Sequence, residues 1–257
     1  HAGPYHEPLV EFLSGMCVRG EEMLLAYGVD DAFAHVTTWP LQRVLADVGL
    51  SSSGAREASD VVRPDFGRAL HVAGKSTNKN TEAVLQCWLA NDGLPPLTVV
   101  AWGPLLERIE RRWPEREWPS NVTMVRQKMP LPELRRLMST TGIHVCPSAC
   151  EGFGHSINEA RSLGAVVVTT DAPPMNELVT DGVDGFLVPV LSDTAVPKNE
   201  LGARTYDIQG GDETVAGLRA ALGRVTALGE AGCCALGLAA RRRFESERRK
   251  FENATRR

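Results

Sequence analysis

Short apolar runs and longer amphipathic stretches alternate along the chain from about residue 69 onward. Runs rich in β-branched residues predict strands at residues 69–73, 97–102, 121–125, 143–146, 165–169 and 185–188. The stretches between them predict helices at residues 80–90, 104–113, 131–140, 155–163 and 176–180. The runs at 97–102 and 165–168 are apolar without alternation, as expected of strands that are buried on both faces. The pattern therefore predicts an α/β fold in which a parallel sheet carries helices on both faces.

The two ends of the chain lack this alternation, so we divide the sequence into segments 1–68, 69–211 and 212–257. In the first segment, residues 7–15 and 21–27 predict short helices, and the serine-rich residues 50–54 predict a linker. The last segment predicts one or two long helices with a break near Gly229. Its final 17 residues carry eight basic and three acidic side chains. We interpret them as a solvated helix end, with contact to a membrane surface or a phosphate polymer as the alternative.

The composition is that of a globular protein, with 43% hydrophobic and 23% charged residues. With 28 Lys and Arg against 32 Asp and Glu, the formal net charge is −4, which gives no reason to expect a nucleic-acid partner. No run approaches the ~18 apolar residues of a membrane-spanning helix. The chain opens at His1 without a leader pattern, and its six cysteines form no C-x-x-C pair. We therefore expect free thiols and a cytoplasmic location.

The first candidate binding loop follows the first strand of the alternating region and reads Gly-Lys-Ser-Thr-Asn-Lys. Gly74 allows the backbone to approach a ligand closely, and Lys75 and Lys79 lie beside a predicted helix N-terminus. Such a loop favours a multiply charged anion such as a diphosphate, with a capped, solvated turn as the alternative. A P-loop is disfavoured, although Ser76 matches the end of its motif, because its first glycine would fall at Ala69 inside a strand.

The second candidate loop lies between Cys146 and the helix predicted at 155–163, and it contains the sequence Glu-Gly-Phe-Gly. Its glycines interrupt helix formation, so we expect Glu151 in the loop and Glu159 in the first turns of the helix. Both carboxylates would then lie near a helix N-terminus, where helix capping alone would favour them. Capping does not explain the Gly-Phe-Gly run, which frees backbone N–H groups to face a ligand.

In this order, the motifs resemble the nucleotide-sugar-binding half of retaining glycosyltransferases of group 1 (family 4), which have the GT-B fold of two Rossmann-like domains. The resemblance rests on P-S-x-x-E-G-F-G-x-x-x-x-E-A, which begins at Pro147, and on the runs at 164–171, 177–179 and 182–188. It covers about residues 69–189 well and the C-terminal helices loosely. It implies that the Rossmann-like domain is the donor half of a GT-B fold and that residues 1–68 are a remnant of an acceptor domain.

The resemblance also implies a role for each residue of the two loops. Lys75 and Lys79 would neutralise the donor diphosphate, and Glu159 would bind the ribose hydroxyls. Glu151 would face the transferred sugar. The donor site would be completed by Gly74, Ser76, Phe153, Gly154, His155 and Ser156. Gln127, in the segment 126–129, would lie where such proteins hold the base.

The implied activity is the transfer of a sugar from a UDP-, GDP- or ADP-sugar to a glycan or small-molecule acceptor, with retention of anomeric configuration. We expect no metal cofactor, because the chain has no Asp-x-Asp motif and its one His/Cys cluster, around His144 and Cys146, matches no zinc pattern. A nucleotide-sugar-binding or regulatory module without turnover is the rival hypothesis. A sugar-nucleotide epimerase is the third. A glycosidase-like role for the glutamate pair is disfavoured, because ribose binding explains Glu159 better.

Overall fold

The computed structural model describes residues 63–114, 118–190 and 212–255, together with three strands near the N-terminus. The chain divides into two compact units. One unit comprises Val62–Ser246, and the other comprises His1–Val61 with Glu247–Arg257. The predicted linker at 50–54 and the final basic residues Arg256 and Arg257 lie outside the described residues.

The smaller unit contains an antiparallel sheet in the order β1 (Val10–Arg19), β2 (Glu22–Val29) and β3 (Phe33–Pro40). The prediction of short helices at residues 7–15 and 21–27 is therefore wrong. The run Glu-Glu-Met-Leu-Leu-Ala-Tyr is rich in helix formers, but β2 pairs along its whole length with both neighbours. Strand pairing of this kind overrides local propensity, which is a weak guide to sheet formation.

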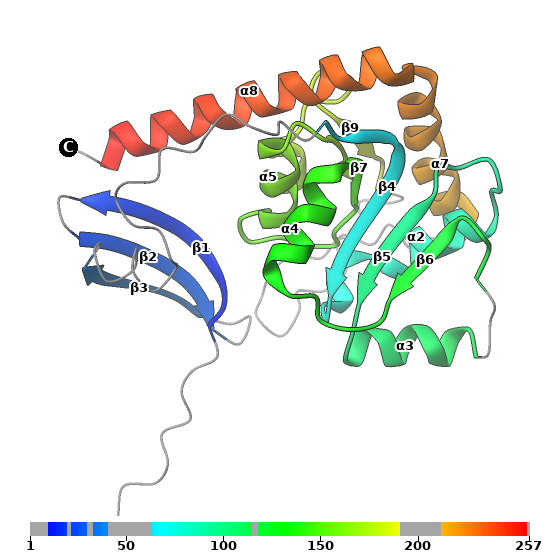
Figure 1. Cartoon of the computed structure of the whole chain (residues 1–257), viewed down its shortest axis with the longest axis horizontal. Coiled ribbons are helices and arrows are strands. Elements are labelled where there is room, and N and C mark those ends of the chain that lie inside the picture. Colours follow the sequence, from blue (N-terminus) through cyan, green and yellow to red (C-terminus); the bar gives the residue numbers. More distant parts are fainter. Residues whose placement is uncertain are drawn as a thin grey trace, which may run out of the picture. The chain divides into compact units, whose positions relative to one another are not determined.

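The larger unit is built on a six-stranded sheet in which all neighbouring strands are parallel. In sheet order these are β6 (Val122–Val125), β5 (Leu97–Ala101), β4 (Asp65–Gly74), β7 (Thr141–Cys146), β8 (Val166–Thr170) and β9 (Phe186–Val188). Every strand predicted in this region is present, and the parallel sheet is confirmed (Figure 1). β4 begins at Asp65 rather than at residue 69, because Asp65 already pairs with Thr141 of β7.

Helices cover both faces of this sheet, as the unbroken apolar strands predicted. They are α2 (Thr81–Leu89), α3 (Pro104–Arg112), α4 (Leu131–Thr140), α5 (His155–Ser162), α6 (Met175–Leu178), α7 (Asp212–Ala227) and α8 (Gly229–Thr255). On one face, Val99 of β5 lies in a core shared with α2, α3, α7 and α8. On the other face, Val100 packs with Met138 of α4, and Val167 of β8 packs with Ile157 of α5.

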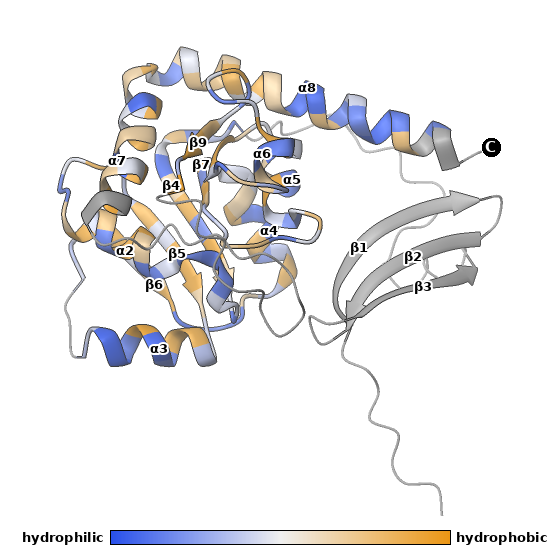
Figure 2. Cartoon of the chain, turned by 180° about the vertical axis from the view of Figure 1, so that it is seen from behind, coloured by the Kyte–Doolittle hydropathy of each residue, from blue (hydrophilic) through white to orange (hydrophobic). Residues whose placement is uncertain are grey.

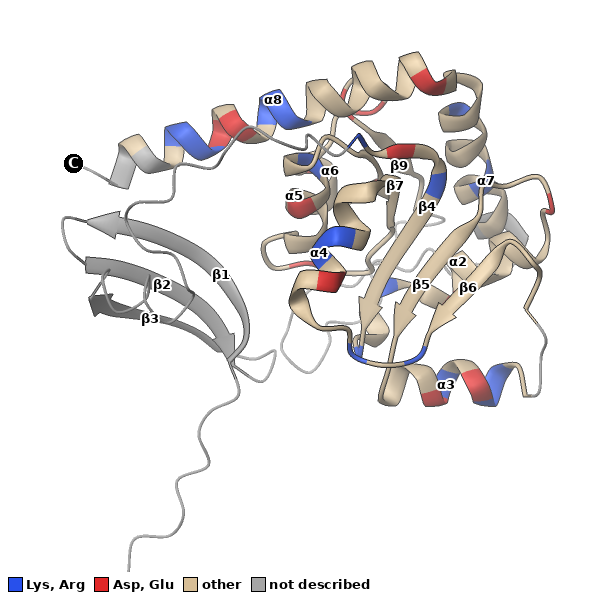
Figure 3. Ribbon diagram, in the orientation of Figure 1, with Lys and Arg blue, Asp and Glu red and all other residues tan. Residues whose placement is uncertain are grey.

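The C-terminal helices break where predicted, between Ala227 and Gly229. The first half of α8 is apolar and its later half is hydrophilic (Figure 2), with the charged positions concentrated in that later half (Figure 3). Arg243 lies where this change occurs. Its guanidinium donates to Thr180 Oγ1 at 2.9 Å, to Asp184 Oδ2 at 2.9 Å and to the Glu177 carbonyl oxygen at 2.6 Å. These bonds tie α8 to the turn between α6 and β9. None of the helices in the described part of the chain combines the length and apolar character needed to span a bilayer.

The strand order places β4 and β7 side by side in the middle of the sheet. From β4 the chain proceeds outward through β5 and β6, then returns to β7 and proceeds outward the other way through β8 and β9. The connections after β4 and β7 therefore leave the carboxyl edge in opposite directions. In open α/β sheets, ligands bind at this topological switch point.

Candidate functional site

The two loops predicted from the sequence meet at the switch point. The loop after β4 contains the short 3₁₀ helix η1 (Thr77–Lys79), and it is hydrogen-bonded to the loop after β7. Asn80 Nδ2 donates to the Pro147 carbonyl oxygen at 2.8 Å, and the Ala149 backbone N–H donates to the Asn78 carbonyl oxygen at 2.7 Å. Asn80 is buried and adopts a left-handed conformation with φ of 51°, which turns the chain from η1 into α2. Asparagine tolerates that conformation better than most residues.

A charged cluster joins the two loops. Lys79 Nζ forms an ion pair with Glu151 Oε1, and it lies 3.5 Å from Ser156 Oγ at the start of α5. The hydroxyl of Ser148 donates to the same Glu151 oxygen at 2.6 Å. The Lys79 side chain is 20% exposed and that of Glu151 is 9% exposed. Because both groups are mostly withdrawn from water, their interaction is screened less than that of a surface ion pair.

Glu159 and His155 extend this cluster along α5. Burial raises the pKa of Glu159, and the nearby charges of Arg135 and Lys79 offset part of that rise. Burial lowers the pKa of His155, and Lys79 adds to this effect while Glu151 opposes it. The charge of Lys79 therefore acts on both α5 side chains across the loops. An ammonium group beside the N-terminus of a helix makes this region suited to a ligand that carries negative charge.

Gly154 forms the N-terminal boundary of α5 with φ of +61°, a left-handed conformation that glycine adopts without strain. A Cβ at this position would lie 2.3 Å from Leu178 Cδ1, so α5 begins close against α6. The neighbouring Phe153 side chain is 54% exposed at the tip of the loop. The sequence-predicted boundary of this helix and the loop position of Glu151 are confirmed.

The remaining predicted residues lie around the cluster. Gly74 ends β4 with φ of +64°. Ser76 caps η1 by accepting a hydrogen bond from the Asn78 backbone N–H at 3.3 Å. Lys75 is exposed on the side of Gly103, at the turn that follows β5. Gln127 is exposed in the loop after β6. The structure thus brings Lys79, Glu151 and Ser156 together and places these other residues at the same carboxyl edge.

His71 of β4 lies beneath the cluster and fixes the start of α2. Its Nδ1 donates to the Val145 carbonyl oxygen at 2.7 Å, and its Nε2 accepts from Thr81 Oγ1 at 2.9 Å. This assignment follows from the carbonyl, which can only accept. Burial lowers the pKa of His71 to about 4, so the ring is neutral near neutral pH. His71 thereby links β4, β7 and α2 directly below the two loops.

The His/Cys cluster considered as a zinc site is part of the core. His144 is buried, and its Nε2 lies 3.1 Å and 3.2 Å from the carbonyl oxygens of Met138 and Thr141. Burial raises the pKa of the Cys146 thiol to about 12, which disfavours the thiolate that binds zinc. Across the described ranges, no group of three or more His, Cys, Asp or Glu side chains is placed to hold a metal ion.

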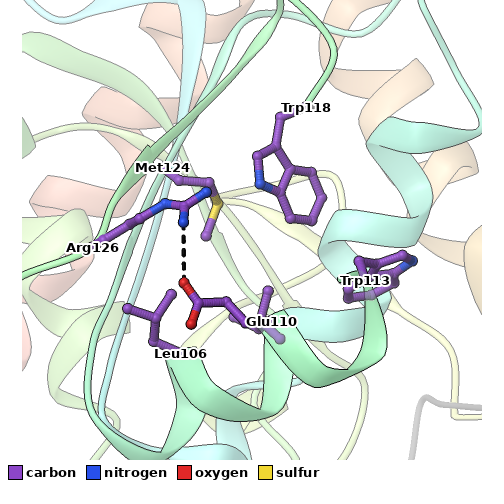
Figure 4. Close-up of a pocket in the computed structure, with 7 residues that line it drawn as sticks. Leu106, Glu110, Trp113, Trp118, Met124 and Arg126 are labelled. Atoms are coloured by element: carbon purple, nitrogen blue, oxygen red, sulfur yellow. Dashed lines mark hydrogen bonds and ion pairs between the residues drawn. The ribbon is translucent and has the colours of Figure 1, made fainter. Parts of the chain in front are cut away.

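A separate cavity of about 210 Å³ lies between α3 and β6 (Figure 4). Trp113 and Trp118 meet there edge to face, with ring centroids 5.8 Å apart. Glu110 of α3 accepts a hydrogen bond from Arg126, which follows β6, at 3.0 Å. The residues of the charged cluster do not line this cavity.

Two residues of the cluster, Ser148 and Thr170, were not predicted from the sequence. Ser148 lies within the quoted motif but received no role, and Thr170 at the end of β8 received none either. Thr170 Oγ1 donates to the Ser148 carbonyl oxygen at 2.8 Å, and both residues are fully buried. The only local signal was position: Thr170 ends the buried strand β8, and Ser148 follows the buried strand β7 by two residues, so both lie at the carboxyl edge.

The order of the strands and the position of the two loops place the larger unit in the Rossmann-like class of α/β domains. A sequence profile of the family "Glycosyl transferases group 1" matches residues 65–198, more than half of the 257 residues. The chain therefore belongs to this glycosyltransferase family.

Relatives agree with this assignment. The chain is 35% identical over 69 residues to alpha-maltose-1-phosphate synthase of Mycolicibacterium smegmatis, a match that covers 27% of this chain and 18% of the relative. Sucrose-phosphate synthase of Thermosynechococcus elongatus has a similar fold, with a TM-score of 0.54 and 21% identity over 81% of this chain and 45% of that one. The pneumococcal O-GlcNAc transferase GtfA, solved with UDP and GlcNAc, gives a TM-score of 0.51 and 20% identity over 72% of this chain and 33% of its own. The chain thus spans less than half the length of each of these proteins.

Proposed function

We propose that the charged cluster is the donor site of a glycosyltransferase that transfers a sugar from a nucleoside-diphosphate sugar to an acceptor. The observation that carries the proposal is the convergence of Lys79, Glu151 and Ser156 at the switch point and at the start of α5. A nucleoside diphosphate is the ligand whose charge matches an ammonium group beside a helix N-terminus. Membership of the glycosyltransferase family supports the proposal of this ligand class.

Within this site, Lys79 binds the diphosphate, with Lys75 as the second cation. Glu159 accepts hydrogen bonds from the ribose hydroxyls. Glu151 faces the transferred sugar, next to the exposed ring of Phe153. Gly74, Ser76, Gly154, His155, Ser156 and Gln127 complete the site through backbone and side-chain contacts.

The chemistry required of these residues is electrostatic. When the anomeric C–O bond breaks, its electron pair stays on the diphosphate oxygen, whose negative charge grows. Lys79 and the α5 N-terminus stabilise that charge more strongly in the transition state than in the bound donor. With cationic side chains in this position, the departing diphosphate needs no metal ion. The acceptor oxygen bonds to the anomeric carbon on the face that the diphosphate leaves and passes its proton to the diphosphate, which gives the retention of configuration that the resemblance to retaining group 1 enzymes implies.

The test is a calorimetric titration of UDP, GDP and ADP, and then of their sugars, in the presence of EDTA. UDP comes first, because the pneumococcal neighbour was solved with it. We expect one nucleotide class to bind without metal and to bind Lys79→Ala about tenfold to a hundredfold more weakly, the loss typical of a charge-assisted hydrogen bond. Lys250→Ala, which removes an exposed lysine on α8, is the matched control and should bind like the parent.

Unchanged affinity in Lys79→Ala would contradict the proposed site, as would binding that requires a divalent metal. Each variant's melting temperature is compared with and without ligand, which separates loss of binding from loss of stability.

A binding module without turnover is the second candidate function. Release of free nucleoside diphosphate from a donor that binds, measured with and without added sugars as acceptors, distinguishes the two functions. Turnover supports the transferase, and saturable binding without turnover supports the module.

A further inference from the structure

We infer that Ser148 and Thr170 are positioning residues that hold the Glu151 carboxylate in place at the switch point. Ser148 is fully buried, and both its hydroxyl and its carbonyl oxygen form hydrogen bonds. Its hydroxyl donates to Glu151 Oε1 at 2.6 Å, and its carbonyl oxygen accepts from Thr170 Oγ1 at 2.8 Å. The end of β8 is thereby connected to Glu151 through two hydrogen bonds.

The two donors that reach Glu151 approach the same carboxylate oxygen. Lys79 Nζ and Ser148 Oγ both donate to Oε1. Two donors on one oxygen restrict the orientations that the carboxylate can adopt. Glu151 has three rotatable side-chain bonds and its loop holds two glycines, so without these contacts it would sample several orientations.

Thr170 acts on Glu151 only through Ser148. Its hydroxyl fixes the peptide that follows Ser148, and with it the direction in which the serine hydroxyl points. The neighbouring Thr169 is a natural control, because it is equally buried and donates to the Cys146 carbonyl oxygen at the same distance of 2.8 Å. The same carbonyl oxygen also accepts from the Ser148 backbone N–H at 2.8 Å, so Thr169 lies one hydrogen bond further from Glu151 than Thr170 does. The two threonines have the same burial and the same hydrogen-bond length, and they differ in the carbonyl oxygen that accepts the hydrogen bond.

The first readout needs no ligand. Relaxation of ¹³C-labelled glutamate side chains measures the order of Glu151, whose signals are assigned with Glu151→Gln. We expect Glu151 to be rigid in the parent, in Thr169→Val and in Thr170→Ser, which keeps the hydroxyl. We expect it to be mobile in Ser148→Ala and Thr170→Val. Equal order in all five proteins, or equal mobility in both valine variants, would overturn the inference.

The second readout rests on the proposed function and separates positioning from general damage. Because Glu151 faces the sugar, Ser148→Ala and Thr170→Val should bind the sugar nucleotide about tenfold more weakly than the parent while binding the nucleoside diphosphate equally well. A parallel loss for both ligands would indicate a merely structural role. If the parent binds no nucleotide, the proposed function fails, and the side-chain relaxation still decides whether the two residues position Glu151.

Discussion

Gly154 offers a sharp test of how the site is built, because the chain supplies its own control two residues away. Replacing Gly154 with alanine forces a Cβ onto a backbone with φ of +61°, which costs about 1–2 kcal/mol for an L-residue. The new Cβ would also lie 2.3 Å from Leu178 Cδ1, so the half-buried leucine side chain must move. Overpacking of this kind typically costs about 1–3 kcal/mol. The expected loss of unfolding free energy is therefore about 2–5 kcal/mol.

Gly152→Ala is the matched control. A Cβ on Gly152 meets nothing within 4 Å, and the residue is exposed. The substitution should leave stability unchanged or raise it by about 0.4–1 kcal/mol, because alanine restricts the unfolded chain. Urea unfolding of the three proteins measures both effects, provided that the slope with denaturant is unchanged. Equal stability of Gly154→Ala and the parent, or an equal loss in Gly152→Ala, would refute the reasoning.

Two further predictions concern protonation and the C-terminal helix. Burial lowers the pKa of His144 from 6.5 to about 4, so between these pH values the unfolded chain binds a proton that the folded chain does not, and stability falls as pH falls. His144→Gln should reduce this slope by up to about 1.4 kcal/mol per pH unit, measured by urea unfolding near pH 5 and pH 6, and an unchanged slope would contradict the assignment. Arg243→Ala leaves the buried carboxylate of Asp184 without its cation and should lower the unfolding free energy by about 2–3 kcal/mol. The exposed Arg242→Ala should change it by less than about 0.5 kcal/mol, and similar losses in both variants would argue against the tie to the α6–β9 turn.

The parts of the fold that follow from local pattern were predictable from the sequence. β5 and β8 are largely apolar and do not alternate with charged residues, as expected of strands in a sheet covered on both faces. The start of α5 could be predicted from the glycines on either side of Phe153, because glycines interrupt helix formation and the helix begins after them. The N-terminal strands were not predictable in this way. Their residues favour helix locally, and only pairing with neighbouring strands decides otherwise.

The same division holds within the candidate site. Lys79 and Glu151 could be predicted from the sequence, because they are charged residues in glycine-containing loops at the ends of strands. The contact between them depends on β4 and β7 being neighbours, which is a property of strand order. The role of Thr170 depends further on the register of β7 and β8, in which Cys146 pairs with Thr169 and brings the next residue beside Ser148. The register between two strands follows from the packing of whole elements rather than from any local motif.

The most direct test of the central claim is to map where a sugar nucleotide binds. Backbone amide NMR spectra of the ¹⁵N-labelled protein are recorded during titration with UDP and UDP-glucose in EDTA. The shifts are expected to concentrate in residues 74–80 and 147–159, which form the two loops and the first part of α5, while the signals of β1, β2 and β3 stay in place. Saturable shifts confined to other parts of the chain, such as the cavity between α3 and β6, would contradict a donor site at the switch point.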